Sequence, residues 1–348
     1  MTDEQLLDGA IEPERNRRLF GHREAETYLA RSYNSGKGHH AILLEGAAGI
    51  GKATLAFRFA NHILHFPHAG DAPDHLIEPD HDAPLTRQII AGASHDLLHL
   101  KRPIDQKTGK LRTAITVEEV RRAGHFLSQT SGTGNWRIVI VDSADDLNRS
   151  AANAILKILE EPPKNAMFLL ISHTPGRLLP TIRSRCLPLR LRPLAPDDLI
   201  AALSALGLSV EGQDMERVTA LAGGSVAEAL KLLNYGGLDI IDAYDQALQS
   251  SSAEARLVMH KLADTLSKRE NETIFAFLIG HVDGDIKLRA RNAALSGDLD
   301  LAERLAVLSS RIASDTAEAD AYNLDRRQLV LDLLSRLRST LQPQPHTA

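Results

Sequence analysis

A glycine-rich loop between an apolar run and a helix-forming segment constrains the fold of this chain most strongly. The apolar run 40–45 (HAILLE) leads into residues 46–52 (GAAGIGK), and the segment that follows, 51–65, has apolar residues at helical spacing. A strand, a glycine-rich loop ending in lysine, and a helix in this order are the setting of a phosphate-binding P-loop. The order therefore predicts an α/β domain built on a parallel sheet.

Each residue of the loop has a predicted role in holding nucleotide. Lys52 would reach the β- and γ-phosphates, and three glycines would let backbone N–H groups turn toward them: Gly46, Gly49 and Gly51. The next residue normally carries a hydroxyl that binds Mg²⁺, but here it is Ala53. We include Thr54 in this degenerate nucleotide site, although one further helical residue is rotated by roughly 100°. We therefore expect ATP to bind weakly or not at all.

Further segments extend the α/β pattern. Asp142 directly follows an apolar run and occupies the position of the Walker B carboxylate of P-loop proteins. Residues 67–93 are rich in Pro, Asp, His and Gly, and we interpret them as an irregular insertion. Strands are expected at 97–101, 111–115, 137–141 and 167–172, and helices at 116–129, after a capping box at Thr116, and at 148–161, after a cap at Asn148. Alternating strands and helices favour a parallel sheet.

The strand signal ends near residue 196, and the rest of the chain is rich in Ala and Leu at helical spacing. We predict three domains. They are an α/β P-loop domain (1–191), a small helical lid domain (192–236) and an all-α domain (237–348).

Composition limits the classes of function. No apolar run approaches the ~20 residues of a membrane span, and residues 1–13 are acidic and polar, unlike a signal peptide. The single cysteine, Cys186, permits no internal disulfide, so a cytoplasmic location is expected. A net charge of −5 argues against an extensive nucleic-acid-binding surface, although a small basic patch remains compatible with it.

Two segments carry a resemblance to a known family. Residues 153–163 (NAILKILEEPP) and 181–186 (TIRSRC) resemble the motifs "N-A-L-L-K-x-L-E-E-P-P" and "T-I-x-S-R-C" of bacterial AAA+ clamp-loader subunits. The resemblance covers about residues 13–235. It implies a RecA-like AAA+ domain, a helical lid and a helical collar that oligomerises, within a complex that uses ATP to place a sliding clamp on primed DNA. The complex is part of the DNA polymerase III holoenzyme, a DNA-directed nucleotidyltransferase.

The resemblance also implies a role for Arg185. In this family, the arginine of the "S-R-C" motif projects into the ATP site of the adjacent subunit as an arginine finger. A guanidinium from outside neutralises charge that spreads over the γ-phosphoryl oxygens during transfer. An isolated arginine would more often be an ordinary surface residue, but the six-residue match reverses that preference.

Departures from the family's pattern distinguish the type of subunit. The ATPase subunits carry Thr after the P-loop lysine, Glu after the Walker B aspartate and a sensor-2 Arg. Here these positions correspond to Ala53, Ser143 and Ala227. The pattern is similar to the delta-prime branch, the stator of the ring, and implies a subunit that is not a competent ATPase alone.

Three alternatives stay open on the sequence. The first is a catalytically active gamma/tau-type clamp-loader ATPase with a reworked site. The second is a AAA+ helicase or recombination motor, which should carry the Walker B glutamate that this chain lacks. The third is a structural scaffold with an unused finger.

Partners follow from the resemblance. They are the gamma/tau ATPase subunits and delta in a hetero-oligomeric ring, the sliding clamp, and the backbone of primed DNA, for which the helix start at Thr116 with Arg121 and Arg122 is a candidate contact. The collar would cover apolar residues at the interface between subunits: Leu329, Leu331, Leu333, Leu334 and Leu337.

Zinc is not expected. The family often inserts a four-cysteine zinc module, for which this chain lacks the cysteines, and a structural site built from histidine alone would be unusual. We interpret the histidines of this region as solvated loop residues: His62, His65, His68, His75, His81, His95 and His99.

Overall fold

The protein was analysed as a computed structural model, which describes residues 6–105, 109, 111–128, 135–208, 213–249, 252–322 and 324–341. The described residues form two compact units, divided between Ala229 and Leu230. The first contains a parallel sheet flanked by helices and the second is helical, which confirms the predicted fold class. The finer division into three domains stays a prediction.

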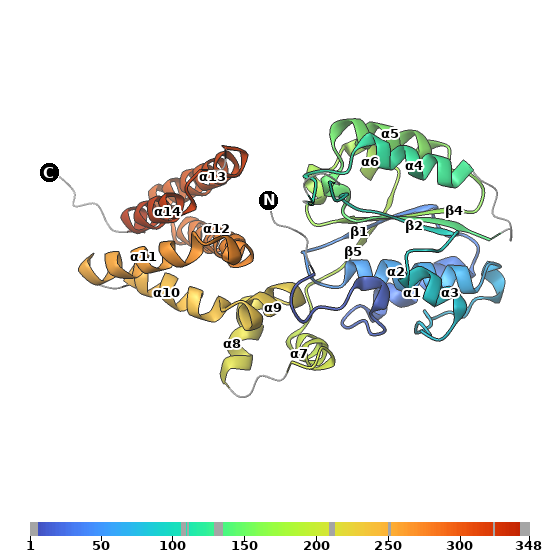
Figure 1. The fold of residues 1–348 in the computed structure, drawn as a ribbon, viewed down its shortest axis with the longest axis horizontal. Coiled ribbons are helices and arrows are strands. Elements are labelled where there is room, and N and C mark those ends of the chain that lie inside the picture. Colours follow the sequence, from blue (N-terminus) through green and yellow to red (C-terminus); the bar gives the residue numbers. More distant parts are fainter. Residues whose placement is uncertain are drawn as a thin grey trace. The chain divides into compact units, whose positions relative to one another are not determined.

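The sheet of the first unit has five parallel strands (Figure 1). Their order is β2-β3-β4-β1-β5, so the strand that leads into the glycine-rich loop lies inside the sheet. The strands are β1 (Ala41–Glu45), β2 (Leu97–Leu100), β3 (Arg137–Val141), β4 (Ala166–Ser172) and β5 (Leu187–Arg190). Because all the strands are parallel, their carboxyl ends, and the loops that follow them, lie at one edge of the sheet.

Helices cover both faces of the sheet (Figure 1). One face carries α1 (Arg23–Asn34), α2 (Lys52–His65) and α3 (Pro84–Ile90), and the other carries α4 (Val117–Ser128), α5 (Arg149–Glu160) and α6 (Pro180–Arg183). Alternate strand residues point to opposite faces. Ile42 and Leu44 accordingly lie in the core under α1–α3, whereas Ala41 and Leu43 lie in the core under α4–α6.

The helices α4 and α5 begin where the capping residues in the sequence predict. The backbone N–H of Thr116 donates to Glu119 Oε2 at 3.0 Å, which is one half of the predicted capping box. The Asn148 side chain accepts from the Ala151 N–H at 2.8 Å, as a helix N-cap should. These contacts confirm the predicted beginnings of α4 and α5.

Three sequence expectations were wrong. No strand spans 111–115, because Leu111 and Ile115 each make only an isolated bridge, to Ile104 and Leu147. The insertion 67–93 contains the short helix α3, which begins with a proline at its first position, where the missing N–H costs nothing. The edge strand β5 went unpredicted, because its sequence LPLR contains proline and half of its residues are exposed.

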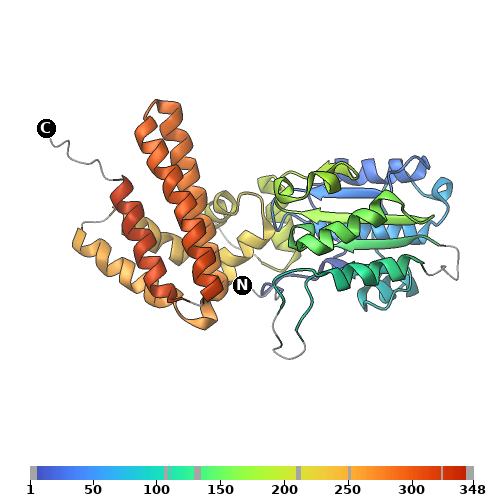
Figure 2. The same ribbon diagram turned by 90° about the horizontal axis from the view of Figure 1, so that it is seen from above.

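Helices make up the rest of the chain. The first unit ends with α7 (Pro196–Ala205), α8 (Gln213–Ala222) and the start of α9 (Val226–Asn234). The second unit contains α10 (Gly237–Gln249), α11 (Ser252–Leu266), α12 (Glu272–Ser296), α13 (Leu299–Tyr322) and α14 (Arg326–Leu341). Figure 2 shows α12 and α13 side by side. In the part of the chain that the structure describes, no helix is both long and apolar enough to cross a membrane.

The apolar residues of α14 are used within their own unit. Leu333, Leu334 and Leu337 are buried, and α14 packs on α11 and α13. The expectation that these residues lie at an interface between subunits was therefore wrong for these three, because neighbouring helices of the same chain already cover them.

We predict that Asn148→Ala lowers the free energy of unfolding of the first unit by about 1 kcal/mol, because the Ala151 N–H loses its acceptor. Urea unfolding can be followed by the fluorescence of Trp136, the only tryptophan in the chain. Asn148→Ser is the control, since serine keeps an oxygen that can cap the helix. An equal loss in both variants would contradict the assigned cap.

Candidate functional site

The glycine-rich loop joins the carboxyl end of β1 to the start of α2. Its three glycines have φ values of 153°, 73° and 99° at Gly46, Gly49 and Gly51, a region that side chains rarely allow. A Cβ at Gly46 would lie 2.6 Å from the carbonyl oxygen of Leu191. Glycine is therefore required by both backbone conformation and space, as the P-loop motif predicts.

Lys52 is bound by its own loop. Its side chain is buried, and Nζ donates to the carbonyl oxygen of Gly46 at 2.8 Å and to that of Ala47. Burial lowers the pKa of Lys52 to about 8, against the opposing influence of the Asp142 and Asp145 carboxylates. Two of the three donors of this ammonium are therefore used by carbonyls of its own loop.

The carboxylates beside Lys52 are also engaged with the chain. Asp142 Oδ2 lies 3.7 Å from His99 Nε2. Asp145 accepts hydrogen bonds from the Ser172 hydroxyl at 2.8 Å and from the His173 N–H at 2.5 Å. Asp145 therefore holds the end of β4 to the loop after β3, an arrangement that suits a structural carboxylate better than a base that activates water.

The positions where the chain departs from the ATPase subunits lie near this loop. Ser143, in place of the usual glutamate, is buried and donates to Asp146 Oδ2 at 3.1 Å. Ala53 packs against the core under α1–α3, and Thr54 is buried in the first turn of α2.

The start of α9 lies directly on the glycine-rich loop. The Ser225 hydroxyl donates to the carbonyl oxygen of Ala48, and the Val226 N–H donates to that of Gly49, both at 2.9 Å. A Cβ placed on Gly49 would lie 2.4 Å from the Ala227 Cβ. The residue at the sensor-2 position is thus a methyl group in contact with the loop, which the sequence alone did not predict.

Arg185 lies just after α6 and has a separate anchor. Its neighbours Ile182 and Cys186 are buried in the core under α4–α6. Its Nη2 lies 2.7 Å from Glu160 Oε1, and its Nη1 donates to the carbonyl oxygen of Thr181 at 3.0 Å. Burial raises the pKa of the Cys186 thiol to about 12, so this cysteine is a packing residue and not a nucleophile.

The structure brings together only part of the predicted site. Lys52, Asp142 and the three loop glycines gather at the carboxyl edge of the sheet. Arg185 lies instead in the helical layer formed by α4–α6. No described contact joins it to Lys52 or Asp142.

The start of α4, a candidate contact for DNA phosphate, is surrounded by its own carboxylates. The Thr116 hydroxyl donates to Glu118 Oε2 at 2.6 Å, and Glu119 caps the Thr116 N–H. Arg121 and Arg122 line a surface hollow along α4, where Arg121 lies 3.9 Å from Glu118. A phosphate at this helix start would meet negative charge before it met the arginines.

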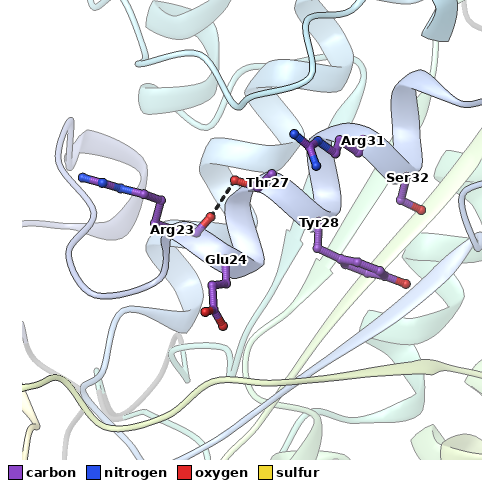
Figure 3. Close-up of a pocket in the computed structure, with 6 residues that line it drawn as sticks. All are labelled: Arg23, Glu24, Thr27, Tyr28, Arg31 and Ser32. Carbon is purple, nitrogen blue, oxygen red and sulfur yellow. Dashed lines mark hydrogen bonds between the residues drawn. The ribbon is translucent and has the colours of Figure 1, made fainter.

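A second hollow lies along α1, and none of the predicted site residues lines it (Figure 3). It is lined by Arg23, Glu24, Thr27, Tyr28, Arg31 and Ser32, all from one helix. The Thr27 hydroxyl donates to the Arg23 carbonyl at 2.9 Å, a bond within the helix, so the hollow lacks converging groups from other elements.

The histidines of 62–99 are not all solvated. His62 is fully buried in α2, between the rings of Tyr33 and Phe66, and within the described residues neither ring nitrogen has a hydrogen-bond partner. The expectation of loop histidines was therefore wrong for His62, which lies on the core face of a helix. Among the described residues, no group of three or more His, Cys, Asp or Glu is arranged to hold a metal.

Comparison with known proteins assigns the chain to a family. A profile of the family described as "DNA polymerase III, delta subunit" matches residues 21–195, about half of the chain. Relatives named "DNA polymerase III subunit delta'" include the protein of Pseudomonas aeruginosa, 36% identical over 199 residues, and that of Escherichia coli, 27% identical over 331 residues. The chain belongs to the DNA polymerase III delta-prime family of clamp-loader subunits.

The extent of these matches differs. The Pseudomonas match covers 57% of this chain and 56% of that delta-prime subunit, whereas the Escherichia match covers 90% and 93%. Among solved structures, a gamma subunit-related protein of Thermotoga maritima covers 92% of this chain and 100% of its own, with 17% identity and a TM-score of 0.46.

We predict that His62 makes the fold less stable in acid. Burial lowers its folded-state pKa to about 4, whereas an unfolded histidine titrates near 6.5. The unfolded chain therefore binds the proton first, and stability falls as pH decreases from about 6.5 to 4, by up to roughly 3 kcal/mol from this residue.

The measurement is the free energy of unfolding against pH. His62→Leu should show a smaller acid-side decline than the unaltered protein, and His68→Leu, which replaces an exposed histidine, is the control. Identical slopes for His62→Leu and the unaltered chain would show that another group causes the decline.

Proposed function

We propose that the chain supplies Arg185 as an arginine finger to the ATP site of a neighbouring subunit in the clamp loader. The observation that carries the proposal is the anchoring of Arg185. Buried residues on either side fix its backbone, a hydrogen bond and an ion pair hold its guanidinium, and its side chain remains 34% exposed. An exposed but fixed guanidinium can neutralise charge on a triphosphate held by another chain.

The chain's own nucleotide site does not hydrolyse ATP efficiently in this proposal. A Mg²⁺-binding hydroxyl, a water-activating carboxylate and a sensor arginine are replaced by Ala53, Ser143 and Ala227. The bonds from Lys52 and from the start of α9 to the glycine-rich loop support the same conclusion. A subunit without these catalytic groups suits a stator, which offers its neighbours a constant surface through the ATP cycle.

The complex follows from the family. The chain would form a hetero-oligomeric ring with gamma/tau ATPase subunits and delta, in the cytoplasm. This ring would use ATP to load the sliding clamp on primed DNA, whose backbone is a further partner.

Lys52 and Asp142 favour a second candidate, an active gamma/tau-type ATPase. Both groups persist at the carboxyl edge of the sheet, and their charges interact. This candidate requires hydrolysis by the isolated chain.

We predict that Arg185→Ala slows clamp loading by a reconstituted complex roughly tenfold or more, because an arginine finger accelerates phosphoryl transfer by about 10³–10⁵-fold. Arg185→Lys should restore little, because an ammonium lacks the planar fork of a guanidinium. Arg183→Ala, an exposed arginine two residues earlier, is the matched control. Unchanged ATP hydrolysis and loading with Arg185→Ala would support a scaffold with an unused finger.

A further inference from the structure

We propose that Glu160 is a positioning residue for Arg185, holding the guanidinium in the orientation in which it meets the neighbouring subunit's ATP. This inference rests on the trans role proposed for Arg185. The two side chains come from different elements, Glu160 from the last residue of α5 and Arg185 from the segment after α6. Their charged groups approach to 2.7 Å, which is an ion pair in direct contact.

Both ends of this ion pair are fixed. On α5, Leu159 is buried, and its carbonyl oxygen lies 3.1 Å from His40 Nε2. On the other side, Ile182 and Cys186 fix the backbone around Arg185 in the same core. A bond between two fixed points costs less side-chain entropy than one between two mobile surface residues.

Glu160 also lies at the end of its helix where the helix dipole disfavours a negative charge. A carboxylate at the end of a helix faces the negative end of the helix dipole, so Glu160 is unfavourable there on its own. The Arg185 guanidinium compensates for this charge. The pairing is therefore more than a chance approach of two flexible side chains.

The ion pair with Glu160 leaves part of the Arg185 guanidinium available to bind phosphate. Of the five N–H donors of an arginine, one is directed to the Thr181 carbonyl, and the guanidinium also forms the ion pair with Glu160. The remaining donors are free of these two contacts, so the finger could bind phosphate oxygens without leaving Glu160. Holding the rotamer before ATP arrives removes an entropic cost from the catalytic step.

The test uses the complex reconstituted with the ATPase subunits, and the readout is the part of ATP hydrolysis that depends on Arg185. That part is the difference between the unaltered and Arg185→Ala complexes. We expect Glu160→Ala to lower the kcat of this Arg185-dependent hydrolysis about twofold to fivefold, the upper range of a part-exposed ion pair, without changing KM for ATP. Glu160→Gln, which keeps an acceptor oxygen, should recover part of the loss.

Two comparisons separate positioning from a general structural effect. Glu161→Ala removes the same charge from the adjacent exposed residue and should leave kcat unchanged. Glu160→Ala added to Arg185→Ala should cause no further loss, because the two residues act through one guanidinium. The melting temperature of each isolated variant checks that it folds.

The outcomes distinguish this inference from the proposed function. If Arg185→Ala slows hydrolysis while Glu160→Ala leaves it unchanged or raises it, Glu160 does not position the finger and the present inference is overturned. A raised rate would mean that Glu160 restrains the finger until ATP displaces it. If Arg185→Ala has no effect, the proposed function itself fails.

Discussion

The buried ammonium of Lys52 is the charge on which the state of the nucleotide site depends. A charge in the interior must be compensated, and in a P-loop a bound phosphate normally does this. Here carbonyl oxygens of the same loop accept its hydrogen bonds, and carboxylates at the edge of the sheet stand near it. The hydroxyl of Ser225 and the N–H of Val226 donate to the next two loop carbonyls, so four successive carbonyls of the loop accept hydrogen bonds from the chain itself.

The glycine-rich loop and Arg185 are held by separate parts of the α/β unit. The glycine-rich loop and the start of α9 form a closed assembly at the carboxyl edge of the sheet. Arg185 is anchored in the core under α4–α6, and no described contact links it to that assembly. The chain can therefore lose the parts of its own catalytic site without disturbing the guanidinium that we propose it offers to a neighbour.

Local features made most of the fold predictable, and distant contacts account for the rest. The capping box at Thr116 and the cap at Asn148 are short-range signals, and both helices begin where expected. The burial of His62 was missed because Tyr33, which packs on it, lies 29 positions earlier in the chain. The contacts of Lys52, Ala227 and Glu160 depend on loop conformation and packing, so residue type alone could not reveal them.

ATP hydrolysis by the isolated chain tests the central claim most directly. Turnover would be measured with Mg²⁺ for the unaltered chain and for Lys52→Ala. The account predicts no hydrolysis above that of the Lys52→Ala variant, because the loop lysine is bound by its own carbonyls and the water-activating carboxylate is absent at Ser143. Sustained hydrolysis that disappears in Lys52→Ala would contradict it and identify an active ATPase.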